Sequence, residues 1–452
     1  MIEVLLNNLK SDYFKANKLS GEDKKRIFRE VKLLLTAQTD KLSKLISEEI
    51  RFNRSDSTKE VERAIKTFSI AESHANYRVE SKYQIDGKIV IERRIARGPL
   101  LAITPFSSPL SSPAHKIAMG LLAGTSVLFK PSRLAIQTGK ALYDVISRAT
   151  RGKLVYFLDK YDNLNQVVAD SRIGIISFTG GYETGSMIIK NAGVKKYHME
   201  LSGGNSMIIF SPSYQDYNSE LIKNIVQGVT SKNGQRCVSI KHLVLPYKQK
   251  GFLDDLINKL NLTIDPITSK DSRLGPLVTV QYARKTEGKV LAMLNSNKDI
   301  KPILRFRRRG ALIYPSVFLN YPVVCSKIKD LLFYDLPGPV IFIHPYRNFK
   351  EYTQMLTEVK QDYIRSGLQI SIFTKKPEQE LIKDIYWGGI IINDITTYRN
   401  DYMSFGGFGM AGLGKEGFFE TYNIYTDPQV IVTNKSENLS MYRRLKESSK
   451  TK

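Results

Sequence analysis

The sequence has few of the residues that build covalent or metal-bound frameworks. It contains only two cysteines, Cys237 and Cys325, and five histidines in 452 residues. Two cysteines exclude a disulfide scaffold and a zinc site made of four thiolates. The histidines are scattered without the spacing of metal ligands, so we predict no metal site.

Long apolar runs are also absent. No stretch approaches the ~18–20 residues that a membrane-spanning helix needs. The N-terminus lacks the basic start, the long apolar segment and the cleavage site of a signal peptide. We therefore expect a cytoplasmic protein with reduced cysteines and no membrane partner.

Acidic residues are scarce relative to basic ones. Asp and Glu total 44, whereas Lys and Arg total 68, which gives a formal charge of +24. Such an excess leaves a nucleic-acid-binding protein as one alternative. The basic runs, such as residues 305–309, are better interpreted as solvated surface, and no recognition motif accompanies them. We therefore expect no nucleic-acid partner.

The order of patterns along the chain indicates an α/β protein. Residues 20–50 and 58–75 have helical periodicity, and residues 77–94 alternate around Asp86-Gly87, a strong hairpin signal. From Gly98 onward, short apolar strands alternate with helices in two series, one of them including a strand at 173–178. This pattern predicts parallel sheets covered by helices, and the length allows two or three domains.

Two positions have neighbours suited to chemistry. Cys237 follows Gly234 and is adjacent to Arg236, a cation that could lower the pKa of the thiol, so it is a candidate nucleophile. The alternative is a buried structural cysteine. Glu200 stands between apolar residues and small ones, as a partly buried general base could. The alternative is an ordinary salt bridge at the end of a strand.

Glycine-rich and proline-rich segments occur at several strand ends. The glycines at 180, 181 and 185 follow a predicted strand and open a helix, where backbone N–H groups could approach a phosphate.

From about Tyr77 to Val432 the chain resembles the aldehyde dehydrogenase superfamily, whose motifs occur here in the family's order. These motifs are residues 101–109, 124–132, 178–185, 200–204, 234–237, 336–340 and 405–412.

The resemblance implies two doubly wound parallel-sheet (Rossmann-like) domains plus a β-arm for oligomerisation. Residues 1–79 and 98–200 would form the cofactor-binding domain and residues 201–423 the catalytic domain. Residues 80–97 and 424–446 would form the arm of a homodimer or homotetramer, and residues 447–452 a tail.

The resemblance also implies a reaction. Cys237 would attack an aldehyde to give a thiohemiacetal and then a thioester, and Glu200 would activate the water that hydrolyses it. A carboxylate at position 200 favours hydrolysis over acyl transfer to coenzyme A. Ser107 occupies the place of the family's oxyanion-binding asparagine, so a weakly active or inactive relative with a binding or structural role is an alternative.

The cofactor implied is NAD or NADP. Its predicted contacts are Thr104, Pro105, Phe106, Lys130, Ser132, Arg133, Phe178, Thr179, Gly180, Gly181, Gly185, Leu201, Asp335 and Pro337. Asp335 and Pro337 replace the family's glutamate and aromatic residue. Arg133 stands where a glutamate often holds the ribose, and a guanidinium suits a 2′-phosphate, which favours NADP. The basic excess is compatible with an anionic aldehyde, such as a semialdehyde or a phosphorylated triose.

Overall fold

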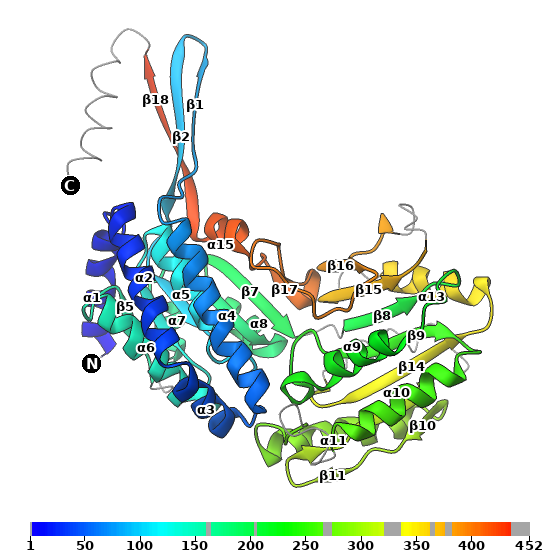
Figure 1. Ribbon diagram of the computed structural model, residues 1–452. Coiled ribbons are helices and arrows are strands. Elements are labelled where there is room, and N and C mark those ends of the chain that lie inside the picture. Colours follow the sequence, from blue (N-terminus) through cyan, green and yellow to red (C-terminus); the bar gives the residue numbers. More distant parts are fainter. Residues whose placement is uncertain are drawn as a thin grey trace.

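Four helices open the chain in the computed structural model, which describes residues 2–159, 164–202, 206–264, 274–320, 336–361, 367–375 and 382–434 (Figure 1). They are α1 (Ile2–Ala16), α2 (Gly21–Ala37), α3 (Thr39–Ile50) and α4 (Arg54–Ser73). Ser20 begins α2 with a capping box, because its side chain accepts from the Asp23 backbone N–H while the Asp23 side chain accepts in return. The helices predicted at 20–50 and 58–75 are confirmed, with a break at Gln38.

The first sheet has six strands in the order β17-β7-β6-β3-β4-β5, all parallel except β17. Successive residues of its central strand β3 enter two different apolar cores, with Leu100 and Ala102 on one face and Leu101 and Ile103 on the other. Helices therefore cover both faces, as in a doubly wound fold. The strands are β3 (Leu100–Ile103), β4 (Val127–Lys130), β5 (Val155–Phe157), β6 (Ile175–Gly181), β7 (Lys196–Ser202) and β17 (Gly412–Leu413), and the helices that follow α4 here are α5 (Ser111–Ala123), η1 (Arg133–Ala135), α6 (Ile136–Ala149), α7 (Leu164–Ala169), α8 (Tyr182–Ala192) and α15 (Phe418–Tyr425).

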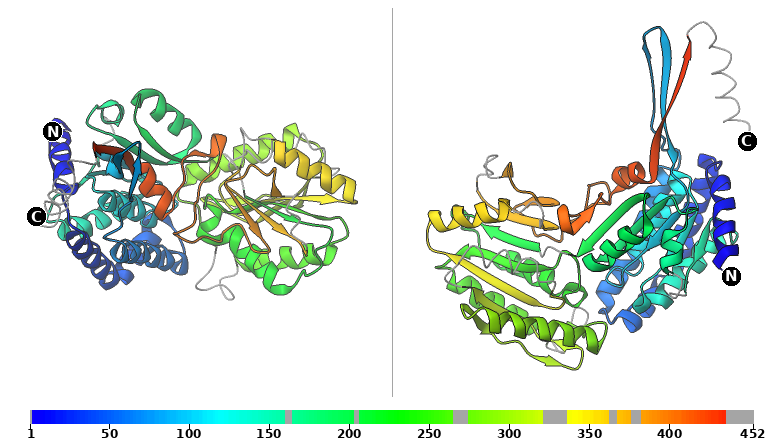
Figure 2. Two further views of the ribbon diagram at one scale, coloured as in Figure 1. Left: turned by 90° about the horizontal axis from the view of Figure 1, so that it is seen from above. Right: turned by 180° about the vertical axis from the view of Figure 1, so that it is seen from behind.

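The second sheet has seven strands in the order β10-β13-β14-β9-β8-β15-β16, and only the edge pair β10–β13 is antiparallel. Figure 2 shows it beside the first sheet, with its own covering helices. The strands are β8 (Ser206–Phe210), β9 (Ile240–Pro246), β10 (Ile300–Leu304), β13 (Ser316–Asn320), β14 (Val340–Tyr346), β15 (Gln369–Phe373) and β16 (Gly389–Ile392); α9 (Ser219–Thr230), η2 (Ser231–Gly234), α10 (Lys250–Leu262), α11 (Val280–Ser296), α13 (Phe349–Gln361), η3 (Gly409–Ala411) and the small pair β11 (Arg308–Arg309) and β12 (Leu312–Ile313) complete this part.

A three-stranded arm projects from the first unit in Figures 1 and 2. It consists of β1 (Glu80–Ile85), β2 (Lys88–Ala96) and β18 (Thr426–Asn434), in the order β1-β2-β18. The predicted hairpin is confirmed, with Asp86 and Gly87 both at positive φ, as a type I′ turn requires. Residues 435–446 of the predicted arm and the tail lie outside the described residues.

The chain passes between the two sheets more than once. Strand β7 runs to Ser202, so the predicted domain limit at 200/201 falls inside a strand of the first sheet. The chain returns through β17, which pairs with Glu200 and Met199, and through α15, which packs on α5. Strand β17 and residues 418–423 of α15 lie within the range predicted for the second domain. A two-residue strand such as β17 leaves no periodic signal in the sequence.

Candidate active site

A cavity of about 690 Å³ lies at the carboxyl ends of β3, β4, β6 and β7, where the second unit meets the first. Strand ends of this kind are the usual ligand positions of doubly wound sheets. All the site residues predicted from the sequence line it except Gly185 and Asp335, and Asp335 lies outside the described residues. The predicted residues on its walls are Thr104, Pro105, Phe106, Ser107, Lys130, Ser132, Arg133, Phe178, Thr179, Gly180, Gly181, Glu200, Leu201, Cys237 and Pro337.

Gly185 does not line the cavity. It lies in α8, where an added Cβ would come within 2.4 Å of the Leu201 side chain. The missing side chain therefore allows α8 to pack closely on β7, and Leu201 in turn lines the cavity. Gly185 therefore contacts the residues that line the cavity without lining it itself.

The backbone leading to Cys237 is strained. Lys232, Asn233 and Gly234 have φ values of 51°, 59° and 69°, and non-glycine residues adopt this left-handed conformation rarely. Asn233 holds the turn, because its amide group donates to the carbonyls of Arg51 and Pro276 and its oxygen accepts from the Gly275 N–H. These bonds fix the segment before Cys237.

A buried ion pair joins this segment to the loop that carries Ser107. The Lys232 Nζ lies 2.6 Å from the Glu60 carboxylate and donates to the Ser107 carbonyl at 3.1 Å. Glu60 also accepts from the backbone N–H and hydroxyl of Ser111. Burial opposes the charge of Glu60, but Lys232 and the Ser111 donors outweigh it and lower the pKa of this carboxyl. The pair positions Ser107 relative to the Cys237 segment.

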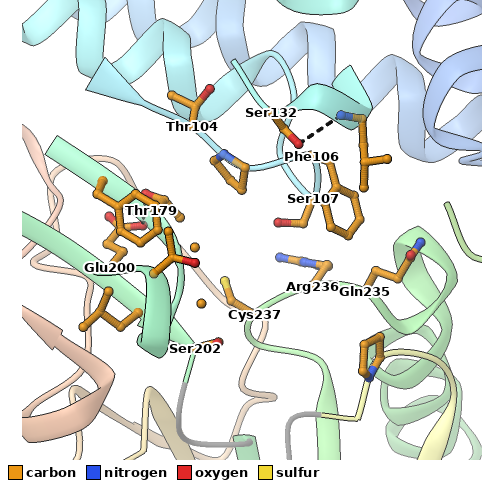
Figure 3. A pocket seen from close by; sticks show the side chains of 18 of the residues that line it. Thr104, Phe106, Ser107, Ser132, Thr179, Glu200, Ser202, Gln235, Arg236 and Cys237 are labelled. Atoms are coloured by element: carbon orange, nitrogen blue, oxygen red, sulfur yellow. Dashed lines mark hydrogen bonds between the residues drawn. The ribbon is translucent and has the colours of Figure 1, made fainter. Parts of the chain in front are cut away.

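Cys237 is a free thiol that is exposed to the cavity. Figure 3 shows its sulfur between Glu200 and Thr179 on one side and Ser107 and Arg236 on the other. Desolvation by the surrounding protein and the nearby Glu200 carboxylate raise the pKa of the thiol, although Arg236 acts to lower it. Arg236 therefore has the expected lowering effect on the thiol pKa, but desolvation and Glu200 outweigh it. The alternative of a buried structural cysteine does not fit this placement.

Glu200 lies near the end of β7 and is 9 % exposed. Its Oε2 accepts from the Thr179 hydroxyl at 3.3 Å. In the described part of the chain, the only group within salt-bridge distance of Glu200 is His198, at 3.7 Å. Burial lowers the pKa of His198 well below its usual range, so this imidazole is neutral. The structure therefore does not show the ordinary salt bridge that was the alternative for Glu200.

The opposite end of the cavity suits an anionic ligand with ribose and phosphate groups. Helix α8 begins at Gly181 without a side-chain cap, which leaves backbone N–H groups beside the cavity. Burial and the nearby Arg133 lower the pKa of Lys130 to about 8. The Ser132 oxygen accepts from the Leu134 N–H at 3.2 Å, drawn in Figure 3. Uncapped N–H groups and two neighbouring cations fit the diphosphate and phosphate groups of NAD(P).

Several residues of the site were missed by sequence reasoning. Glu60, Arg63 and Arg399 are distant in sequence from Cys237, and only the fold brings the charge of Arg399 near Cys237 and those of Glu60 and Arg63 near its neighbour Arg236. His198 could have been found, because it precedes Glu200 by two residues on a strand and therefore shares its face.

Over the described ranges, no group of three or more His, Cys, Asp or Glu residues could hold a metal ion. The helices of these ranges include none with the length and hydropathy of a membrane span.

Comparison with known proteins identifies the family. The model of the aldehyde dehydrogenase family matches residues 7–431. The chain is 27% identical to a lactaldehyde dehydrogenase of Methanococcus aeolicus, over 88% of this chain and 85% of the relative. It is 24% identical to a 3-sulfolactaldehyde dehydrogenase of Priestia aryabhattai, over 92% and 87% of the two chains.

Solved structures agree with this assignment. The glyceraldehyde-3-phosphate dehydrogenase GapN of Methanocaldococcus jannaschii, complexed with NADP, matches with a TM-score of 0.86 and 25% identity, covering 96% of this chain and 94% of that one. Aldehyde dehydrogenase 21 of Physcomitrella patens, in complex with the product succinate, has the same fold with a TM-score of 0.87 at 23% identity, covering 97% and 91%. The chain belongs to the aldehyde dehydrogenase family and is an NAD(P)-dependent enzyme that oxidises an aldehyde to an acid.

Proposed function

We propose that Cys237 is the nucleophile and Glu200 the general base of this reaction. The observation that carries the proposal is their placement on facing walls of one cavity whose other end is lined by Lys130 and Arg133. The base lies on β7 of the first sheet, whereas the nucleophile lies on the turn between η2 and β9 of the second unit, so the placement of the two units sets their separation.

The residues support a two-stage reaction. The Cys237 thiolate adds to the carbonyl carbon, and the oxyanion of the thiohemiacetal accepts from the Cys237 N–H and the Ser107 hydroxyl. When bound, NAD(P)⁺ supplies the acceptor for the hydride that leaves this carbon. Glu200 then takes a proton from water, the resulting hydroxide attacks the thioester, and the carboxylic acid leaves as the Cys237 thiolate is released.

NADP is the preferred cofactor in this proposal. Lys130 and Arg133 line the cavity together, and burial and the charge of Arg133 both disfavour the charged form of Lys130. A 2′-phosphate would relieve this repulsion, whereas a free ribose hydroxyl would not. We expect Arg133→Glu to lower kcat/KM for NADP about 10- to 100-fold and to change it little for NAD. Steady-state rates with both cofactors measure this, and a wild-type preference for NAD would contradict it.

The substrate in this proposal is a small aldehyde with an anionic group. Arg236, Arg399, Arg63 and Lys232 act electrostatically on Cys237 or on one another. Lys232 and Arg399 have carboxylate partners in Glu60 and Glu416. Within the described ranges Arg236 has no carboxylate at salt-bridge distance, and its hydrogen bonds to Ser231 and Thr397 are both 3.5 Å long. A partly buried cation with such weak partners favours an anionic ligand.

One experiment tests the function. 3-Sulfolactaldehyde, glyceraldehyde 3-phosphate and succinic semialdehyde are each assayed with NAD and NADP by the absorbance of the reduced cofactor. Lactaldehyde, acetaldehyde and propionaldehyde serve as uncharged controls. We expect the highest kcat/KM with an anionic aldehyde and no turnover in Cys237→Ala. Turnover by Cys237→Ala at the wild-type rate would contradict the nucleophile, and a preference for the uncharged aldehydes would contradict the anionic class.

The arm supports a homo-oligomer. It presents β1 and β18 as open edges, and Val430 and Val432 of β18 are 54% and 53% exposed. Long edge strands with apolar side chains usually have a partner. We propose that a second copy covers them, and that the enzyme works in the cytoplasm, where a reducing environment keeps Cys237 as a thiol.

A further inference from the structure

A row of polar side chains lies behind Glu200, on one face of the first sheet. Strands β6 and β7 pair Ser177 with His198 and Thr179 with Glu200. The alternating residues Phe178 and Met199 enter the apolar core on the opposite face. Because side chains on a strand alternate, the four polar residues share the face that α5 covers.

Hydrogen bonds connect this row to a buried lysine. The Lys116 Nζ, on α5, donates to the Ser177 hydroxyl oxygen at 2.9 Å. The Ser177 hydroxyl lies 3.0 Å from Nδ1 of His198. Lys116, Ser177 and His198 are each fully buried, so the groups have fixed partners and no access to bulk water.

The direction of these bonds determines where the imidazole carries its proton. Lys116 has donors only, so Ser177 accepts from it and is free to donate its own hydrogen to Nδ1 of His198. A neutral imidazole whose Nδ1 accepts carries its single hydrogen on Nε2. Burial keeps His198 neutral, and the charges of Lys116 and Arg399 and the neighbouring His115 act in the same direction.

The resulting Nε2–H points to Glu200. The His198 Nε2 and the Glu200 Oε1 are 3.7 Å apart, and both are buried atoms without a hydrogen-bond partner in the described structure. A small rotation of the carboxylate brings the two into hydrogen-bond range. Each group would satisfy the other. The charges of Lys116 and Arg399 also act on Glu200, but Lys116 donates to Ser177 and Arg399 pairs with Glu416.

We propose that His198 is a positioning residue that orients the Glu200 carboxylate for attack by water, with Ser177 and Lys116 fixing its tautomer. The inference rests on the proposed function of Glu200 as general base. His198 does not take the proton itself, because its environment opposes a second proton on the ring. Its effect should therefore fall on hydrolysis of the thioester and not on formation of the thioester.

Two substitutions separate the contacts of His198. His198→Gln keeps an N–H donor near the position of Nε2, so it retains the bond to Glu200. His198→Asn keeps a polar group near Nδ1, toward Ser177, but does not reach Glu200. His242→Asn is the matched control, because His242 is also buried on a parallel strand but faces His344 in the second sheet.

The probe is p-nitrophenyl acetate, which needs neither the cofactor nor the natural aldehyde. The Cys237 thiolate attacks the ester carbonyl and releases nitrophenolate in a burst, which reports acylation. Water then hydrolyses the acetyl thioester to acetate and thiol, which sets the steady rate. We expect His198→Asn to slow the steady rate about 10- to 100-fold and to leave the burst rate within about twofold. His198→Gln should recover the steady rate to within about threefold, and the control should behave as the wild type.

The variant Glu200→Gln distinguishes failure of the positioning role of His198 from failure of the general-base role of Glu200. A slow steady rate in Glu200→Gln with a wild-type rate in His198→Asn would overturn the positioning role and leave the base in place. A wild-type steady rate in Glu200→Gln would overturn the base and with it this inference. Equal loss of burst and steady rate in both His198 variants, with a lower unfolding temperature, would mean that His198 is only structural.

Discussion

At the scale of single residues, the charges near Cys237 determine how reactive its thiol is. Glu200 is one of the groups that raise the pKa of this thiol, so Glu200→Gln should lower that pKa. At a fixed pH below the pKa, a lower value means a larger thiolate fraction. We therefore expect alkylation by iodoacetamide at pH 7.5 to be about 3- to 10-fold faster in this variant.

The alkylation rate as a function of pH, followed by intact mass, measures the change. Its midpoint should move to lower pH in Glu200→Gln and to higher pH in Arg236→Gln, because Arg236 lowers the thiol pKa in the wild type. An unchanged midpoint in both variants would mean that neither charge acts on the thiol.

The buried pair of Glu60 and Lys232 is a second feature at this scale. Glu60→Gln leaves Lys232 as an uncompensated buried cation, and we expect the free energy of unfolding at pH 7 to fall by about 3–5 kcal/mol. Because the folded-state pKa of Glu60 is lowered, its contribution is present above the ordinary carboxyl pKa and is lost as the pH falls through the lower folded value.

Urea unfolding of both proteins at pH 7 and near pH 3 measures the difference, which should be smaller at the lower pH. The control is Glu48→Gln, whose pair with Lys44 is exposed and 3.9 Å apart, with an expected effect under about 0.5 kcal/mol. Equal stability of the wild type and Glu60→Gln at pH 7 would contradict the assigned role of the pair.

The sequence indicates site residues whose neighbours in the chain are themselves informative. Cys237 and Glu200 were candidates because of their neighbours, the family resemblance supplied their roles, and both lie on the cavity. Glu60 and Lys232 are 172 positions apart, and their contact depends on how α4 packs beside the turn before Cys237. No local pattern encodes such a contact, so the residues that position the site were not predicted.

At the scale of elements, the start of α8 depends on its close packing against β7. A Cβ at Gly185 would meet the Leu201 side chain at 2.4 Å, so Gly185→Ala should displace Leu201 or the first turn of α8. We expect KM for the cofactor to rise about 10-fold with a smaller change in kcat. The control is Gly251→Ala in α10, where a Cβ has nothing within 4 Å. An unchanged KM would show that the helix start does not contribute to cofactor binding.

The bounds of an element are harder to predict from the sequence than its presence. The strand predicted at 173–178 occurs as β6 (Ile175–Gly181), because Thr179, Gly180 and Gly181 continue the pairing with β7. Glycine disfavours strands on average, but here the neighbouring strand supplies the hydrogen bonds. The hairpin at Asp86-Gly87 was predicted correctly because its turn chemistry is local.

At the scale of the whole molecule, we expect the arm to determine whether the enzyme is a single chain or an oligomer. Strand β18 is the edge of a sheet with the order β1-β2-β18, and its Val430 and Val432 share an exposed face. Lysine at both positions places charge on that face and blocks edge pairing. We expect the wild type to be a homo-oligomer by light scattering and Val430→Lys with Val432→Lys to shift it toward the monomer. Leu291→Lys on α11, which is 53% exposed in the wild type, should leave the mass unchanged. A monomeric wild type at micromolar concentration, or a double variant of unchanged mass, would contradict pairing through the arm.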